Sequence, residues 1–539
     1  MRDATDRKLF ALLVVASGWL FVYFDKLNNP NELVRVYMAR AVLERRTYSI
    51  GERRAAGAAF DDVGPIYSQW GYVNDKALVC DDPRARPPSC TGKLYAAKAP
   101  GASFLAVPVL AVLEGALRRP PTRTESILAL RWVLCIVPSA LFWVAFRRFL
   151  LLRGVSEATA LACTLAGALG SLSFTYGQMF AGHQLAALAL ATSFLAAFWH
   201  WSATSARAAL LSGFAAALAV CCDYAAAPAA AIVMAGWFLS RRASWRAIGL
   251  ALLAALPPLL LLAHFHATAF GSLWSTPYSH LENAEFARDI SPGVLGISTP
   301  TWERVVNSFF LPPLGLFFWS PWIALALGAA PLLLRRRHVA GATAVAVIAY
   351  YLLFQVTHAL WRSGWSVGPR YITPVVPFAA AVVGFAIAEA DARQRSWALA
   401  LLGGTGAASV LATGIASSVC QGFPLEVYNP LVEVVAPLLA HGYVAPNVMQ
   451  LVGVPGLWSA LPALAAIAIA VALLLTAPLR IAAGVRAPYR VALAVAALLV
   501  LAQWTATSGD APEHAAAVRF LASVWQPNPP PGARPFSSR

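Results

Sequence analysis

Long apolar runs alternate with short polar connections along most of this chain. The runs consist mainly of Ala, Leu and Val, and their length suits helices that cross a hydrocarbon core of about 30 Å. They lie near residues 8–24, 101–117, 126–146, 156–179, 182–200, 207–222, 225–240, 247–266, 309–334, 339–357, 373–390, 397–418, 456–478 and 488–505. The pattern predicts an all-α polytopic membrane protein.

One connection is far longer than the others. It separates the first apolar run from the rest and is dense in carboxylates, basic residues and aromatics. In a membrane protein, a loop of this size is where recognition or chemistry is expected. We therefore divide the chain into a first transmembrane helix at 1–24, an outer loop that holds the expected active-site residues at 25–100, a multi-span bundle at 101–505, and an outer Pro-rich tail at 506–539.

Composition agrees with this membrane class. Of the 539 residues, 59% are hydrophobic and 12% are charged, and the mean hydropathy is +0.63, which excludes an ordinary soluble domain. The net charge of +16 would suggest nucleic acid in a soluble protein. Here most of the excess is arginine that orients spans and meets anionic lipid, so we expect membrane lipid and no nucleic acid as partners.

Arginine collects at every second connection, and short basic loops stay on the cytoplasmic side of a membrane. The residues concerned are Arg2, Arg7, Lys8, Arg147, Arg148, Arg153, Arg207, Arg241, Arg242, Arg246, Arg335 to Arg337, Arg393, Arg395, Arg480, Arg486 and Arg490. This distribution predicts a multi-pass protein of a bacterial-type cytoplasmic membrane. Its N-terminus is cytoplasmic, and loops 25–100, 267–305, 358–372 and 419–455 face outside.

The span count follows from the same distribution. Placing 25–100 outside and Arg147 inside allows an odd number of crossings between them, yet two apolar runs lie there. One of the two is expected to be re-entrant or interfacial. Pro108 and the run from Arg118 to Arg123 mark where the pattern of a membrane-spanning helix is weakest. We expect about 13 spans; a count of 14 would contradict the arginine pattern.

Two cysteines differ from those in apolar runs. Cys80 and Cys90 lie ten residues apart in the outer loop, across two aspartates and several prolines, and an oxidising compartment would permit a local disulfide. Their spacing has no zinc pattern. The chain has no P-loop, GxGxxG, GxSxG or HExxH motif, which disfavours a nucleotide-driven pump or a soluble-type hydrolase.

The start of the outer loop predicts a helix from about Glu32. Leu33, Val36, Tyr37 and Leu43 recur at helical spacing, with Arg35 on the polar face, which is typical of an amphipathic helix lying on a membrane. Glu32 would project from the N-terminus of that helix. A helix-dipole role for this carboxylate competes with a catalytic one.

The end of the loop places Tyr95, Lys98 and Pro100 directly before an apolar run. A lysine there lies at head-group depth. It is either a snorkelling anchor or a cation that holds a lipid-linked phosphate.

Taken together, the two ends resemble the polytopic lipid-dependent glycosyltransferases of the GT-C superfamily, which includes lipid A aminoarabinose transferases and protein O-mannosyltransferases. In that family an outer loop opens with an acidic pair and a Tyr-containing helix and closes with Tyr, Lys and Pro. Asn31-Glu32, Arg35, Tyr37, Tyr95, Lys98 and Pro100 match this order. The layout also resembles the family at Ala181 to His183, Asp223-Tyr224, Phe270 to Ser272 and Gly368 to Tyr371.

The resemblance implies inverting transfer of a sugar from a polyprenyl-phosphate donor to a glycan, lipid or protein acceptor outside the membrane. A carboxylate would take the acceptor proton as general base. Lys98 and Arg370 would stabilise the leaving phosphate, and no nucleotide cofactor is expected. A divalent metal stays possible, although no ligand spacing singles out a metal site.

The chain departs from the family at the first acid of the pair, which is Asn31. An amide cannot act as a base. Glu32, Asp61, Asp62 or Asp75 would have to serve instead, or the protein is an inactive homologue.

His183 and Asp223 stand at the ends of apolar runs. His183 would orient a substrate or hydrogen-bond a loop carbonyl, and Asp223 is a functional candidate because an acid at a membrane edge is costly. The alternatives to an enzyme are a transporter or flippase for a lipid-linked substrate, for which we find no inverted repeat, and a catalytically inactive assembly protein.

Overall fold

The computed structural model describes residues 3–21, 29–57, 59–199, 205–240, 244–291, 296–424, 426–480 and 486–507, together with residues 516, 519 and 520. The Pro-rich segment 527–539 and the basic residues Arg2, Arg241 and Arg242 lie outside these ranges.

The described chain is dominated by apolar helices. The longer ones are α1 (Ala4–Gly18), α4 (Gly101–Leu117), α5 (Arg123–Leu130), α6 (Val137–Leu152), α7 (Glu157–Leu169), α9 (Gly182–Phe198), α10 (Ala206–Cys222), α11 (Ala226–Leu239), α12 (Trp245–Phe270), α16 (Ile323–Arg335), α17 (Val339–Thr357), α18 (Val375–Ala388), α19 (Ala392–Ser417), α23 (Leu461–Leu475) and α24 (Arg486–Thr505). A π-helical segment, η1 (Arg131–Ile136), joins α5 to α6.

Shorter elements fill the connections. They are α2 (Pro30–Arg45), α3 (Pro65–Trp70), α8 (Leu172–Gly177), η2 (Pro277–His280), α13 (Ala284–Ile290), α14 (Trp302–Phe309), α15 (Leu316–Trp319), η3 (Arg370–Ile372), η4 (Leu431–Val435), α20 (Ala436–Ala440), α21 (Val448–Leu451), α22 (Gly456–Ser459) and η5 (Ala477–Arg480).

Within the described ranges, five helices are long and apolar enough to cross a membrane by length and composition: Arg123–Leu152, Trp245–Phe270, Val339–Thr357, Ala392–Ser417 and Arg486–Thr505. Nine more apolar helices have 10 to 17 residues. The helices agree with the predicted all-α polytopic class, whereas the count of about 13 spans stays a prediction.

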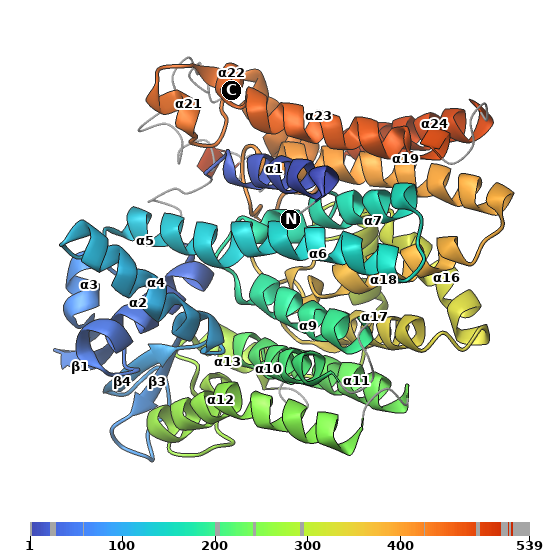
Figure 1. Cartoon of the computed structure of the whole chain (residues 1–539). Helices are drawn as coiled ribbons and strands as arrows, with labels where there is room; N and C mark the ends of the chain where they lie inside the picture. The colour runs from blue at the N-terminus through green and yellow to red at the C-terminus, as the bar shows by residue number, and fades with distance from the viewer. Residues whose placement is uncertain are drawn as a thin grey trace.

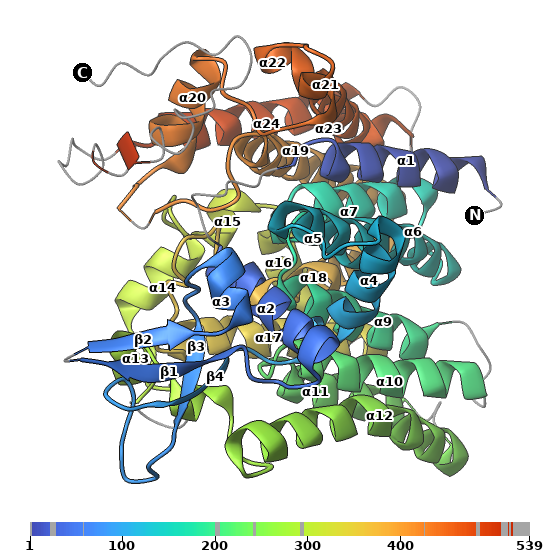
Figure 2. The ribbon, with the colours of Figure 1, turned by 90° about the vertical axis from the view of Figure 1, so that its left-hand side faces the viewer.

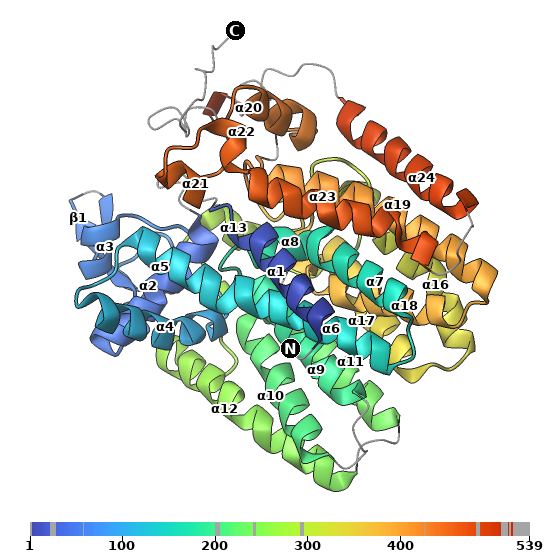
Figure 3. The same ribbon diagram turned by 45° about the horizontal axis from the view of Figure 1, so that its top comes forward.

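The helices form a layered bundle (Figures 1 and 3). On one side, α19 packs against α23 and α24, and α1 packs against α23; on the opposite side, α10 packs against α9 and α12. Between these sides lie α6, α7 and α18. Gly213 permits the close approach of α10 and α12, because a Cβ there would meet the Ala251 carbonyl oxygen at 2.0 Å.

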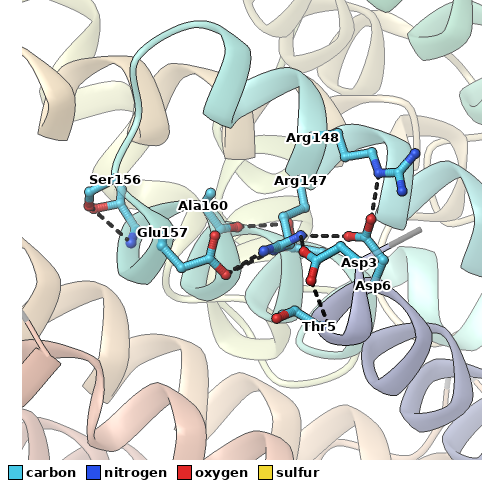
Figure 4. A network of polar contacts seen from close by, with 10 residues as sticks. Asp3, Thr5, Asp6, Arg147, Arg148, Ser156, Glu157 and Ala160 are labelled. Atoms are coloured by element: carbon cyan, nitrogen blue, oxygen red, sulfur yellow. Dashed lines mark hydrogen bonds and ion pairs between the residues drawn. The ribbon is translucent and has the colours of Figure 1, made fainter. Parts of the chain in front are cut away.

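A network of charges joins α1, α6 and α7 (Figure 4). The buried Arg147 guanidinium donates to Asp6 and to Glu157, each at 2.5 Å, and Arg148 donates to the other oxygen of Asp6. Asp6 is itself buried. These contacts satisfy charges that would otherwise be costly inside the bundle, and they fix the first helix to the two that follow.

The outer loop contains a sheet that the sequence pattern did not predict. Its strands are β1 (Gly51–Ala56), β2 (Ala59–Val63), β3 (Lys76–Cys80) and β4 (Gly92–Ala96), all antiparallel in the order β2-β1-β4-β3. Figure 2 shows this sheet beside α3 and α13 at one end of the molecule. The charged β1 and the uninterrupted burial at the start of β3 conceal the alternation by which a half-buried strand is recognised.

Helix α2 also differs from the expected amphipathic helix on the membrane surface. The eleven consecutive residues from Asn31 to Ala41 are all buried, so protein covers every face of this stretch. The expectation was wrong because the polar residues Arg35 and Arg40 face partners inside the protein instead of solvent or lipid head groups.

Helix α4 packs against α2 and α5, and Figure 1 shows it at the same end of the molecule as the sheet. The expectation that one of the two runs between residue 100 and Arg147 does not cross the membrane stays a prediction.

Asp62 binds the sheet to a later loop. It accepts hydrogen bonds from Arg53, at 2.7 and 3.1 Å, and from Lys76, while Arg53 also pairs with Glu282 at 2.7 Å. Burial acts to raise the pKa of Asp62, but the hydrogen bonds from Arg53 and Lys76 outweigh it and leave the pKa below its ordinary value.

We predict that Asp62→Asn lowers the thermal unfolding midpoint at pH 7, because Lys76 loses its carboxylate partner; breaking such a buried pair costs about 3 kcal/mol. A carboxylate with a lowered folded-state pKa adds stability above its unfolded-state pKa and loses it as the pH falls through the folded-state value. The difference from wild type should therefore shrink below pH 3.8. Asp61→Asn, at the exposed neighbour, should change little; a pH-independent difference would contradict the assignment.

Candidate active site

A cavity of about 450 Å³ lies where the outer loop meets the helix bundle. Its walls come from α2, the segment before α4, the start of α9, the end of α10, the loop around η2, the end of α17, and η3. Arg35, Lys98, His183 and Asp223 all line it. Four residues singled out from separate parts of the sequence thus share one cavity.

Glu32 does not line this cavity. Its carboxylate accepts hydrogen bonds from Arg131 at 2.9 and 2.6 Å and from the backbone N–H of Phe180 at 2.6 Å, and the residue is 1% exposed. These three hydrogen bonds anchor the N-terminus of α2 to η1 and to the segment before α9. Glu32 therefore has a structural role, and we call its hydrogen bonds with Arg131 and the Phe180 N–H the Glu32 clamp.

Arg35 lies one helical turn after Glu32. Its guanidinium donates to the backbone oxygen and to the side-chain oxygen of Asn31, and its Nε is buried without a hydrogen-bond partner in the described part of the chain. A Cβ on Gly182 would meet the Cys222 carbonyl oxygen at 2.8 Å, as well as Arg35 Nη2 at 2.6 Å, so glycine is needed where α9 begins. Asn31 therefore orients a cation, a role that an amide oxygen can fill.

Lys98 stands beside Asp75, with 3.2 Å between Nζ and the carboxylate. Burial lowers the pKa of Lys98; Asp75 opposes that shift, and the positive charges of Arg35 and Arg370 add to it. The segment is held against α10 at Gly101, where a Cβ would meet the Cys221 carbonyl carbon at 2.5 Å. A bound anion would relieve the repulsion among these cations.

His183 and Asp223 form a hydrogen-bonded pair between the start of α9 and the end of α10. His183 Nδ1 lies 2.6 Å from Asp223 Oδ2, and the other oxygen of Asp223 accepts from the Ala225 N–H at 3.1 Å. His183 Nε2 is buried with no hydrogen-bond partner among the described residues. Both residues line the cavity, and His183 keeps one ring nitrogen without a hydrogen-bond partner in the described ranges.

Tyr371 closes one side of the cavity, and Arg370 precedes it in the chain. Tyr371 packs edge-on against His183 at 5.1 Å and against His358 at 5.5 Å between ring centroids. The guanidinium of the half-buried Arg370 lies 5.7 Å from the Tyr371 ring centroid, and its Nε has no partner in the described ranges. Arg370 is thus a third cation in the neighbourhood of Lys98.

Part of the cavity lining is apolar. It contains Leu353 and Phe354 of α17 together with Ile290 and Ile297. Leu353 is 60% exposed and Ile297 is 39% exposed. A hydrocarbon chain packed against α17 would therefore contact residues that also line the cavity.

Several other predicted site residues lie elsewhere. Tyr37 is fully buried and donates to the Gly71 carbonyl oxygen at 2.9 Å, and Tyr95 packs against Phe270 with ring centroids 5.5 Å apart. Asp61 is exposed on β2 and Asp62 is paired within the sheet, so neither lines the cavity. Cys80 and Cys90 form a disulfide with their Cα atoms 5.7 Å apart.

The sequence analysis did not single out His358, Tyr350, Leu353 and Phe354, which all line the cavity. His358 carries a weak signal, as a histidine directly after a long apolar run. The other three look like ordinary membrane-span residues, and only the packing of α17 shows their position.

No group of three or more His, Cys, Asp or Glu side chains is arranged to hold a metal ion within the residues that the structure describes. A divalent metal therefore stays a matter for experiment.

No protein-family model matches the chain, and no curated protein sequence matches it significantly. Among solved structures, the chain is similar to ArnT from Cupriavidus metallidurans in the apo state, with 15% identity and a TM-score of 0.44 over 93% of this chain and 75% of that one. ArnT bound to undecaprenyl phosphate gives 14% identity and a TM-score of 0.46 with the same coverage.

Arabinosyltransferase EmbB from Mycobacterium smegmatis is also similar, with 14% identity and a TM-score of 0.39 over 98% of this chain and 42% of that one. These TM-scores are too low to carry a functional conclusion. The function is therefore inferred below from the chain's own residues.

We predict that Glu32→Gln acts mainly on stability, because it leaves the buried Arg131 without its charged partner. Breaking such a pair costs about 3 to 5 kcal/mol, which should lower the thermal unfolding midpoint of the purified protein. Glu125→Gln, which removes an exposed carboxylate paired with Arg119, is the matched control and should change little. Equal midpoints for wild type and Glu32→Gln would contradict the clamp.

Proposed function

We propose that this protein is a membrane glycosyltransferase that moves a sugar from a polyprenyl-phosphate donor to an acceptor at the outer face of a bacterial-type cytoplasmic membrane, with inversion at the anomeric carbon. One observation carries the proposal. Arg35 and Lys98 line a cavity whose lining also includes the exposed apolar side chains of Leu353, on α17, and Ile297. Cations in one cavity with exposed apolar side chains suit a phosphate with a long hydrocarbon chain.

Charge supports a phosphodiester as the occupant. Three cations, Arg35, Lys98 and Arg370, stand near two carboxylates, Asp75 and Asp223, so three minus two leaves one excess positive charge with neutral histidines. A phosphodiester between a sugar and a polyprenol carries one negative charge. Its binding would neutralise the site, and partly buried cations bind phosphate oxygens strongly.

The same cations would also stabilise the phosphate as it leaves the sugar. When the bond between the anomeric carbon and the phosphate oxygen breaks, negative charge grows on the leaving phosphate. Preorganised cations at that position lower the barrier, because they gain interaction energy as the charge develops. Lys98 and Arg35 would both gain from that charge, since burial disfavours the charged form of each.

The apolar part of the lining supports the lipid half of the proposal. The exposed Leu353 and Ile297, together with Phe354, would contact a polyprenyl chain that approaches from the membrane. Within the membrane this contact is stabilised by van der Waals packing, because lipid tails are as apolar as these side chains.

We predict that Lys98→Gln and Arg370→Gln each weaken the binding of a polyprenyl phosphate to the protein in nanodiscs. A charge-assisted hydrogen bond is worth about 1.5 to 3 kcal/mol, which corresponds to roughly tenfold to a hundredfold in the dissociation constant. Arg362→Gln is the matched control, because Arg362 lies in the same outer loop but is exposed and pairs with Glu303. Unchanged binding in both cavity variants would contradict the proposed phosphate site.

The enzymatic claim itself requires transfer of sugar. Proteoliposomes containing the protein should move radiolabel from some member of a panel of polyprenyl-phosphate hexoses and pentoses to envelope lipid or glycan. Chelation in the same assay tests a divalent metal requirement. Binding without transfer would favour a flippase for the lipid-linked substrate or an inactive assembly protein.

A further inference from the structure

The proposed reaction needs a base, and the carboxylates of the outer loop are poorly placed to supply it. Glu32 is held by Arg131 and by the Phe180 N–H, Asp61 is exposed on the sheet, and Asp62 is paired with Arg53 and Lys76. Asp75 is paired with Lys98, with 3.2 Å between the carboxylate and Nζ. None of these four carboxylates lines the cavity. Asn31, at the position where the resemblance would place the first acid, is bonded to Arg35 and has no basic group.

His183 has the features that a base requires. The ionised Asp223 carboxylate, 2.6 Å from Nδ1, favours the tautomer that carries its proton on Nδ1 and leaves a lone pair on Nε2. Asp223 is itself fixed by the Ala225 N–H. A histidine with a purely structural role would be expected to use both ring nitrogens, whereas His183 Nε2 is buried without a partner in the described ranges.

The surroundings favour a neutral imidazole in the resting site. The charged and titratable groups that face the ring come from four other elements: Asp223 at the end of α10, Arg35 on α2, Arg370 and Tyr371 on η3, and His358 at the end of α17. Burial of the ring disfavours a positive charge on it, Asp223 opposes that effect, and Arg370 and Arg35 add to it. Asp223 also compensates the charge that appears when the ring accepts a proton.

We propose that His183 is the general base of this site and that Asp223 is its positioning residue. The inference rests on the proposed function. The acceptor O–H or N–H meets Nε2, and its oxygen or nitrogen forms the new bond to the anomeric carbon. The bond from that carbon to the phosphate oxygen breaks and leaves its electron pair on the phosphate. The acceptor proton passes to Nε2 and is released to water after the glycosylated product and polyprenyl phosphate depart.

The base is tested by separating donor binding from transfer. His183→Gln should bind polyprenyl phosphate within about twofold of wild type while transfer falls by about 10² to 10⁴, the usual contribution of a general base. Wild-type transfer should rise with pH through the range in which imidazole loses its proton, and His183→Gln should lack that rise. His264→Gln, at an exposed histidine outside the cavity, is the matched control and should leave transfer unchanged.

The positioning role of Asp223 is tested by the rate of transfer and its pH dependence in two variants. Asp223→Asn should reduce transfer and shift the pH dependence to lower values, because the imidazolium loses its compensating charge. Asp223→Glu, which retains a carboxylate, should restore part of the transfer.

The outcomes distinguish this inference from the function on which it rests. Wild type that transfers sugar, with His183→Gln equally active, overturns the base alone. Wild type that binds polyprenyl phosphate but transfers none of the sugars overturns both. If His183→Gln fails to fold, the test uses the pH dependence of wild-type transfer and the two variants Asp223→Asn and Asp223→Glu. A transfer rate that is unchanged in Asp223→Asn, together with wild-type transfer that does not depend on pH, overturns the inference.

Discussion

The candidate site depends on one buried ion pair. Glu32 and Arg131 lie 99 residues apart and meet in the interior, where the Phe180 N–H completes the hydrogen bonding of the carboxylate. Removing two charges from water is expensive, and such a pair persists only with nearly complete hydrogen bonding. In return it fixes the start of α2, so that Arg35, one turn later, meets the start of α9 at Gly182.

The remaining site follows from close backbone contacts and unequal charge. Gly101 brings the Lys98 segment onto the end of α10, and the tight fit at Gly182 brings Arg35 beside His183 and Asp223. The result is a cavity with cations and exposed apolar residues of α17 in its lining, next to an imidazole whose Nε2 has no hydrogen-bond partner in the described chain. The ion pair of Arg147 with Asp6 is hydrogen-bonded, whereas Arg35 Nε and His183 Nε2, on two residues that line the cavity, have no hydrogen-bond partner in the described chain.

Hydrophobic periodicity predicted most of the helices well, since Gly101–Leu117 and Val339–Thr357 have the expected bounds. It failed in the outer loop. There the sheet is held by Arg53, Asp62 and Lys76, whose charges obscure any strand pattern. It also misjudged α2, because a buried arginine and an exposed one look alike in sequence. Residue type and position in the sequence were enough to predict Arg35, Lys98, His183 and Asp223 as site residues. Only the three-dimensional packing shows that these four line one cavity and that Glu32 is instead bound to Arg131 outside it.

The central claim is that cations of the outer loop and of η3 hold a lipid-linked phosphate in front of the His183–Asp223 pair. The most direct measurement is an experimental structure of the purified protein, determined by electron cryo-microscopy with an added polyprenyl phosphate. The account predicts phosphate density between Arg35, Lys98 and Arg370, with the hydrocarbon chain along Leu353 and Phe354. An empty cavity at saturating lipid, or phosphate bound away from these residues, would contradict it.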